Sequence, residues 1–320
     1  MSRQSGTSAL RGLIFTVLAV VAAPGVAGPF TELVVIGDSL SDTGNVYARS
    51  GGAEPPSPPY DAGRYSNGPV WVEVVADELG LPGPAAVYGT AASGKTNYAE
   101  GGATTGNNTS PIGELGMAWQ VDQLAANAIL TAGLGDALVV LWGGANDFFN
   151  DVFADPTVSV GNLADLITSL IGLGAESFLL PNLPPLEETP ELRGTLAAPL
   201  AAGFSTGFDT AYRAEIANLQ AANVGVDFYY FDVYAIFEDA LANPGDYGLT
   251  NVTDSAFNGS TVVSDPDDYL FWDGVHPTRV AHAELGRSAA ALVPAPPALL
   301  LMLTGLGMLG VRRRRDGSAA

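Results

Sequence analysis

The segment LVVIGDSLSDTGN (residues 33–45) decides how this chain folds. It begins with four apolar residues, three of them β-branched, and then changes abruptly to Gly-Asp-Ser. This pattern predicts a buried strand that ends in a small polar turn. Ser39 then lies at the carboxyl end of a strand, where a rigid scaffold holds loops that often carry function. The same turn could instead be an ordinary strand-to-helix connection in which Ser39, Ser41 or Asp42 caps a helix.

Strands and helices alternate outward from this segment through residues 29–293. Strands are expected at residues 33–36, 96–99, 137–142, 177–180 and 226–231. Helices are expected at residues 69–79, 117–130, 163–171, 204–222 and 279–292. The continuous apolar run at 137–142 is typical of a parallel strand covered on both faces. The chain therefore predicts one α/β domain, with an open, mostly parallel sheet covered by helices.

Two segments between these elements are expected to be loops. Residues 51–68 are rich in proline and glycine. Residues 243–268 are acidic and rich in Gly, Asn and Asp, but their Asp spacing does not match an EF-hand loop. A solvated surface loop is the preferred interpretation of the second segment, and a calcium site is the alternative.

Composition excludes several kinds of site and partner. The 320 residues include no cysteine and two histidines, so thiol catalysis, disulfides and a three-histidine zinc site are impossible. We expect no metal and no cofactor. The net charge is −21, and the two ends hold six of the 13 basic residues but one of the 34 acidic ones. The middle keeps 7 basic and 33 acidic residues, a net charge of −26 that repels nucleic acid.

Residues 1–28 have the layout of a secretory signal peptide. Arg3 and Arg11 precede an apolar run at 13–23, and small residues follow it. Cleavage is expected near Ala27. The alternative is a buried N-terminal helix, which the Pro-Gly pair after the run disfavours.

The other end, residues 294–320, has three parts: a proline-rich start, an apolar run at 298–311 and four arginines. The run is short for a membrane span, which needs about 20 residues. This tail resembles the PEP-CTERM sorting signal of Gram-negative bacteria, although Ala295 stands where that family usually has Glu. The resemblance implies processing by an exosortase and release to the cell surface or extracellular matrix. A simple membrane anchor is the alternative.

A serine nucleophile needs a base, and the chain has two candidates. His276 precedes the last helix, and His282 lies inside it, where a histidine usually has a surface or packing role. Asp273 is three residues before His276, a spacing that places both side chains on one side of a turn. Its carboxylate could then accept the Nδ1 proton and leave Nε2 facing Ser39. A turn histidine without a partner is the alternative for His276.

An acyl-transfer site also needs donors for the oxyanion. Gly101 and Gly102 follow one expected strand, and Asn146 follows another, so all three reach the same edge of the sheet. The backbone N–H of Ser39 is a further candidate donor. Glycine turns after strands are common in any α/β protein, and only their position at successive carboxyl ends favours a functional role.

Four blocks in this order resemble those of the GDSL, or SGNH, hydrolases, and two further segments, residues 60–71 and 180–186, resemble the lipase/acylhydrolase branch of that family. The blocks are Gly37-Asp38-Ser39-Leu40-Ser41-Asp42-Thr43-Gly44-Asn45, Asn97-Tyr98-Ala99-Glu100-Gly101-Gly102-Ala103, Gly144-Ala145-Asn146-Asp147 and Asp273-Gly274-Val275-His276. They span residues 30 to 290 approximately. The resemblance implies a flavodoxin-like, three-layer α/β/α sandwich with a mostly parallel central sheet.

The resemblance also implies a role for each matched residue. Ser39 would be the nucleophile, His276 the base and Asp273 its orienting acid. Ser39 N–H, Gly102 and Asn146 would form the oxyanion hole. Asp38 would have no place in the triad.

The function expected from these features is an exported serine esterase or lipase that cleaves carboxylic esters through an acyl-enzyme. An acetylesterase acting on extracellular polysaccharide is an alternative, suggested by the sorting tail and by aromatic residues suited to sugar stacking. Those residues are Tyr60, Tyr65, Trp71 and Trp119. A catalytically silent matrix protein is a third possibility, which the complete set of catalytic residues disfavours.

Overall fold

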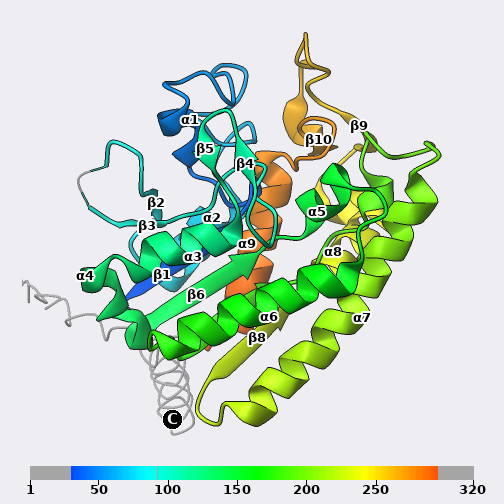
Figure 1. Cartoon of the computed structure of the whole chain (residues 1–320). Helices are drawn as coiled ribbons and strands as arrows, with labels where there is room; N and C mark the ends of the chain where they lie inside the picture. Colours follow the sequence, from blue (N-terminus) through cyan, green and yellow to red (C-terminus); the bar gives the residue numbers. More distant parts are fainter. Residues whose placement is uncertain (1–29, 92, 295–320) are drawn as a thin grey trace, which may run out of the picture.

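A sheet of six parallel strands forms the middle layer of residues 30–91 and 93–294, the part of the chain that the computed structural model describes (Figure 1). Its strands, in spatial order, are β2 (Ala85–Ala86), β3 (Lys95–Asn97), β1 (Glu32–Gly37), β6 (Ala137–Trp142), β7 (Ser177–Pro181) and β8 (Asp227–Phe231). The central strand β6 is entirely apolar and buried because both faces of the sheet are covered.

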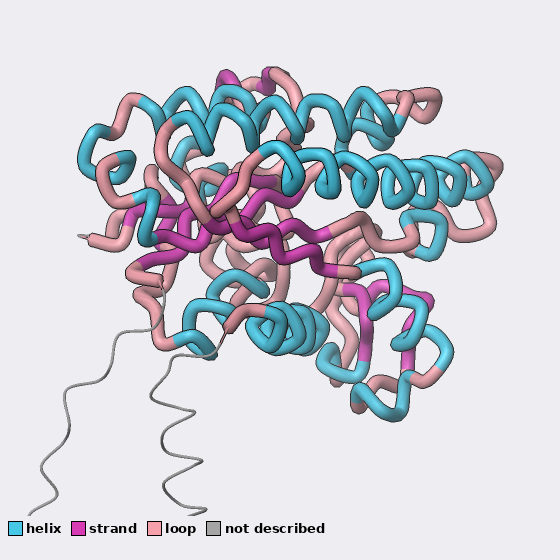
Figure 2. Tube along the Cα trace, turned by 90° about the horizontal axis from the view of Figure 1, so that it is seen from below, coloured by secondary structure: helices cyan, strands magenta, loops and turns pink. Residues whose placement is uncertain are grey.

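Helices cover both faces of the sheet, so the molecule has three layers (Figure 2). Val34 and Ile36 point to one face, while Leu33 and Val35 point to the other, as the two-residue period of a strand requires. The first face is covered by α3 (Met117–Ala125), α6 (Pro156–Gly172) and α7 (Ala198–Ala222). The second face is covered by α2 (Trp71–Leu79), α8 (Val233–Ala242) and α9 (Arg279–Leu292). The predicted fold class is confirmed.

The strand order places the functional loops together. Apart from the short edge strand β2, the order along the sheet is that of flavodoxin-like folds, in which the first strand in sequence lies between the second and the third. The connections therefore leave in opposite directions from β1 and β6, and ligands bind in the crevice that results. Gly37 at the end of β1 is paired with Trp142 at the end of β6. The loop with Ser39 and the loop with Asn146 consequently emerge side by side.

Most predicted elements lie where they were expected, but several boundaries were wrong. The expected helix at 117–130 is two helices, α3 and α4 (Ala128–Thr131), because the Asn127 side chain accepts the Leu130 N–H at 3.3 Å and starts a new helix. Helix α6 begins at Pro156, with Asp155 as its N-cap, and α7 begins at Ala198; both starts precede the predicted ones. The helices α1 (Asn45–Arg49), α5 (Ala145–Asn150) and α8 were not predicted.

The acidic segment 243–268 contains more regular structure than a solvated loop. It includes the strand β9 (Asn251–Ser255), which pairs in parallel with β10 (Tyr269–Phe271). No three His, Cys, Asp or Glu side chains within the described residues are arranged to hold a metal ion. The remaining short elements are the hairpin of β4 (Thr109–Ser110) and β5 (Gly113–Glu114), and the 3-10 helices η1 (Leu134–Asp136), η2 (Leu186–Glu188), η3 (Pro244–Tyr247) and η4 (Pro266–Asp268).

Two expectations concern segments outside the described residues. The predicted signal peptide (1–28) and nearly all of the predicted sorting tail (294–320) lie there. Within the described ranges, no helix is both long and apolar enough to span a bilayer.

His282 on α9 is buried completely and has a packing role. Its Nδ1 accepts the backbone N–H of Trp71 at 3.3 Å, which links α9 to the start of α2. Burial, with a smaller contribution from His276, lowers the pKa of His282 to about 3. The imidazole is therefore neutral in the folded protein.

This buried histidine should make the fold sensitive to acid. An unfolded His282 titrates at its ordinary pKa of about 6.5. Because the pKa of His282 is lower in the folded protein, its contribution to stability is complete above the unfolded pKa of about 6.5. That contribution is lost progressively as the pH falls from 6.5 toward 3. Between pH 7 and 5 the loss is about 2 kcal/mol. In urea denaturation, His282→Gln should lose about that much less stability than the parent over this interval. Equal losses in the two proteins would contradict the prediction.

Candidate active site

The end of β1 is held rigidly before it delivers Ser39. Gln120 on α3 accepts the Gly37 N–H at 2.9 Å and donates to the Gly37 carbonyl at 2.8 Å. Both side chains of the next two residues are enclosed: Asp38 is 2 % exposed and Ser39 is 9 % exposed. Asp38 accepts the Leu40 N–H at 3.0 Å, which closes the turn around Ser39. The serine hydroxyl is thus presented from a turn with little freedom to move.

The capping alternative holds for one residue of this loop. The Asp42 carboxylate accepts the N–H groups of Gly44 and Asn45, at 2.7 and 2.6 Å, where α1 begins. Ser41 has another role, because its hydroxyl accepts the indole N–H of Trp71 at 3.0 Å. Ser39 caps no helix.

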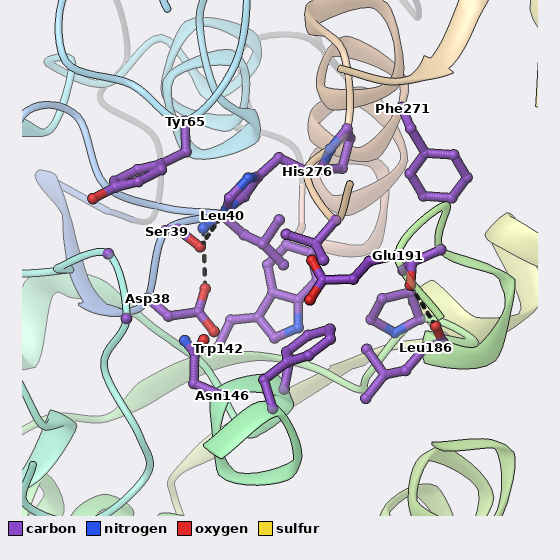
Figure 3. Close-up of a pocket in the computed structure, with 18 of the residues that line it drawn as sticks. Asp38, Ser39, Leu40, Tyr65, Trp142, Asn146, Leu186, Glu191, Phe271 and His276 are labelled. Carbon is purple, nitrogen blue, oxygen red and sulfur yellow. Dashed lines mark hydrogen bonds between the residues drawn. The ribbon is translucent and has the colours of Figure 1, made fainter. Parts of the chain in front are cut away.

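Ser39, His276 and Asp273 form a continuous hydrogen-bonded chain (Figure 3 shows the first two). The distance from Ser39 Oγ to His276 Nε2 is 2.8 Å. His276 Nδ1 lies 2.9 and 2.8 Å from the two oxygens of Asp273. The Asp273 carboxylate also accepts the backbone N–H of His276 at 2.8 Å, so the turn that joins the two residues holds the ring in place.

Charge in this turn favours a basic imidazole. Although burial opposes ionisation, the facing His276 and several hydrogen bonds lower the pKa of Asp273 to about 2. Burial also opposes protonation of His276, but the Asp273 carboxylate outweighs it and raises the pKa of His276 above its ordinary value. Asp38 differs: its burial raises its pKa to about 7. Asp38 has no contact with Nδ1 of the base, and Asp273 alone occupies that place.

Ser39, Gly102 and Asn146 all line the cavity that opens beside Ser39 Oγ, and each carries an N–H group. Neither Ser39 N–H nor Gly102 N–H has a hydrogen-bond acceptor among the described residues. Asn146 lines the same cavity, and one of its two amide hydrogens is bound to the Ala103 carbonyl at 2.9 Å. The second amide hydrogen of Asn146 is left for a ligand.

The structure separates the roles of the two neighbouring glycines. Gly101 donates its N–H to Asp42 at 3.1 Å, and a Cβ on it would lie 2.3 Å from the ring of Tyr65. Gly102 has a φ of +83°, which turns its backbone out of the extended strand conformation. Gly101 therefore allows close packing, and Gly102 offers the unbound N–H that the resemblance assigns to it.

A cavity of ≈ 390 Å³ opens beside Ser39. Figure 3 shows Trp142 beneath it and Leu186 and Phe271 on the side away from Tyr65. Its apolar lining comes from Leu40, Tyr65, Trp142, Ala145, Phe149, Pro184, Pro185, Leu186, Phe237, Phe271, Val275 and Pro277. Such a lining suits a hydrocarbon chain.

The aromatic residues proposed for sugar stacking do not form a common platform. Trp71 is buried completely in the core. Trp119 stacks on Tyr88 outside the cavity lining, with ring centroids 6.2 Å apart. Tyr65 alone lines the cavity, where it packs on the His276 ring with centroids 5.2 Å apart. The suggested stacking role was therefore wrong for Trp71, whereas Tyr60 and Tyr65 lie edge to face with ring centroids 6.3 Å apart.

Tyr60 has a role that the sequence did not indicate. Its hydroxyl donates to Asp273 Oδ2 at 2.6 Å, across 213 positions of chain. No local motif signals such a contact. The contact forms because the loop at 51–68 lies against the turn of Asp273.

Comparison with known proteins assigns the chain to a protein family. A sequence model of the family described as "GDSL-like Lipase/Acylhydrolase" matches residues 33–289, most of the chain. The chain belongs to this family. As a GDSL lipase/acylhydrolase it is a carboxylic ester hydrolase, and its relatives include proteins described as GDSL esterase/lipase.

Individual relatives of this GDSL protein are distant in sequence. A phosphatidylcholine-sterol acyltransferase of Aeromonas hydrophila is 29 % identical, with 82 % of this chain and 90 % of that protein covered. A thermolabile hemolysin of Vibrio parahaemolyticus is 28 % identical, with 78 % and 61 % covered. A solved structure of a carbohydrate acetylesterase from Sinorhizobium meliloti matches with a TM-score of 0.46 at 16 % identity, covering 82 % of this chain and 97 % of that one.

Proposed function

We propose that this GDSL hydrolase is an exported serine esterase that cleaves carboxylic esters with acyl chains of medium length. The observation that carries the proposal is the 2.8 Å contact between Ser39 Oγ and His276 Nε2 at the mouth of an apolar cavity. A hydroxyl becomes a nucleophile at neutral pH when an adjacent base accepts its proton.

The proposed reaction has two halves. Ser39 Oγ attacks the ester carbonyl while its proton moves to His276 Nε2, and Asp273 stabilises the imidazolium that results. Ser39 N–H, Gly102 N–H and the Asn146 amide hold the oxyanion of the tetrahedral intermediate. The imidazolium then gives its proton to the departing alcohol. A water molecule, deprotonated by the same imidazole, attacks the acyl-enzyme and releases the acid.

The apolar cavity supports an acyl chain longer than acetyl. Its volume of ≈ 390 Å³ is several times that of an acetyl group, which is about two water-sized groups of about 30 Å³ each. An acyl chain of about six to ten carbons would fill such a space and leave little water in it. An acetyl group would leave most of the apolar wall without a partner.

Activity against p-nitrophenyl esters of increasing chain length tests this assignment. We expect catalytic efficiency to rise from acetyl to a maximum at about six to ten carbons, because each buried CH₂ contributes about 0.8 kcal/mol. Phe149→Ala, which enlarges the cavity, should move the maximum to longer chains. Phe153 is 80 % exposed and outside the cavity lining, so Phe153→Ala is the matched control. A maximum at acetyl, together with release of acetate from acetylated polysaccharide, would favour the alternative acetylesterase.

A fluorophosphonate probe tests the chemistry independently of the substrate. The probe should label Ser39 in the folded protein and not in denatured protein. Absence of labelling would favour the catalytically silent matrix protein.

Export and processing are parts of the same proposal, and the sequence of the two ends supports them. We infer removal of residues 1–28 by a signal peptidase and processing near residue 294 by an exosortase, which would leave the enzyme at the cell surface or in the extracellular matrix. Mass spectrometry of the mature protein tests both cleavages. A mature chain that retains either end would contradict the corresponding step.

A further inference from the structure

We propose that Tyr60 is a positioning residue that sets the proton affinity of the Asp273–His276 pair, an inference that rests on the proposed function. The Tyr60 hydroxyl donates to Asp273 Oδ2 at 2.6 Å. Tyr60 belongs to none of the four sequence blocks and does not itself line the cavity beside Ser39, although its ring packs edge to face on Tyr65, which does. A phenylalanine would keep this ring contact, so removal of the hydroxyl would act on the reaction through the Asp273 carboxylate.

The Asp273 carboxylate has few other partners. Oδ1 accepts the backbone N–H groups of Val275 and His276, at 3.0 and 2.8 Å. Oδ2 receives the Tyr60 hydroxyl and the His276 ring alone among the described residues. Without the hydroxyl, Oδ2 would face only the imidazole. The hydrogen bond from Tyr60 thus partly neutralises the negative charge on Oδ2, which would otherwise act on His276 alone.

Tyr60 is well placed to keep this contact. Its ring meets Trp272 and Phe257 edge to face, with centroids 6.0 and 5.9 Å apart. Burial first, and then the charge of Asp273, raise the pKa of Tyr60 well above its usual range, so the hydroxyl remains a donor. The aromatic contacts do not involve the hydroxyl, and a phenylalanine would preserve them.

The loop that carries Tyr60 is fastened to the segment that follows His276. Ser66 donates its hydroxyl to the Pro277 carbonyl at 2.9 Å, and the Asn67 side chain accepts the Arg279 N–H at 2.8 Å. Both contacts are independent of Tyr60. The loop should therefore remain docked when the Tyr60 hydroxyl is removed, and the effect of that removal can be measured by itself.

The direction of the effect follows from charge. Loss of the donor concentrates negative charge on Oδ2, which strengthens its attraction for the imidazolium and raises the pKa of His276 further. Less of the base is then free at a given pH. The other titratable groups around the imidazole are unchanged by the substitution. They are Asp38, Tyr65, Glu191 and His282.

Tyr60→Phe tests the proposal. At pH 7 we expect kcat/KM to fall about tenfold, the scale of a hydrogen bond to a charged group. The acidic limb of the pH profile should move to higher pH, and the rate of fluorophosphonate labelling should show the same displacement without any ester substrate. Tyr247→Phe is the matched control, because Tyr247 donates to Asp239 at the same distance of 2.6 Å outside the cavity lining.

Each outcome decides one question. A displaced acidic limb in Tyr60→Phe and an unmoved limb in Tyr247→Phe would support the proposal. An acidic limb that stays in place in Tyr60→Phe would overturn it, even if the melting temperature falls, because a structural role alone does not move a pH profile. Failure of the parent protein to label would instead contradict the proposed function, whatever Tyr60 does.

Discussion

Ser39→Ala should reduce kcat/KM for a medium-chain ester by a factor on the order of 10⁴ to 10⁶ and should abolish labelling by a fluorophosphonate. The variant lacks the oxygen that attacks the ester, while the N–H donors of the oxyanion hole remain. Residual activity would come from those donors and from binding alone. Melting temperature should change little, because His276 is the one hydrogen-bond partner of this hydroxyl among the described residues.

Ser41→Ala is the matched control for this variant. Ser41 is two positions away in the same loop and is buried completely, but its hydroxyl accepts the Trp71 indole N–H at 3.0 Å. Its loss should lower stability by about 1 kcal/mol, the usual contribution of one hydrogen bond. Activity per folded molecule should remain close to that of the parent. A Ser39→Ala protein that kept more than a tenth of the parent activity would contradict the assignment of the nucleophile.

Asn146→Ala should lower kcat by about 10² to 10³ with a small change in KM. The second amide hydrogen of Asn146 would bind the oxyanion more strongly than the neutral carbonyl of the substrate. Its removal therefore raises the barrier of the chemical step and affects substrate binding little. Steady-state kinetics with the preferred ester measures the two constants separately.

Asn150→Ala supplies the control for the helix. Asn150 is exposed, lies at the other end of α5 and is absent from the cavity lining. Its replacement should leave kcat and KM unchanged. If Asn146→Ala raised KM and left kcat intact, Asn146 would contribute to ground-state binding and would not belong to the oxyanion hole.

The sequence predicted the sheet well where the signal was local. The strand β6 and the helix α9 have the predicted bounds, because a continuous apolar run and a clear amphipathic period mark them. The start of α7 was missed by six residues, since Ala, Leu and Gly from Ala198 onward lack a polar face that would reveal the period. Asn127 divides the expected helix at 117–130 through a side-chain cap that apolar spacing does not report.

In the site, too, contacts between residues close in sequence could be predicted, and contacts between residues far apart in sequence could not. Asp273 and His276 could be paired from a spacing of three residues, and the structure places them in contact. The choice between Gly101 and Gly102 depends on where Asp42 and Tyr65 reach in space, which no local pattern specifies. Tyr60 lies too far from Asp273 in the chain for spacing to predict its contact.

The fastening of the 51–68 loop to the segment after His276 has a mechanical consequence. The proposed nucleophile Ser39 and the proposed oxyanion donor Asn146 follow two strands, β1 and β6, that are paired along six residues of each. The proposed base and its acid lie in the turn between β10 and α9, and α9 packs on the second face of the sheet. A few polar contacts join this turn and the start of α9 to the loop at 51–68. Warming would break these polar contacts before the hydrogen bonds of the sheet open. The enzyme would then lose activity while its core is still folded, and cooling would restore the activity without refolding of the core.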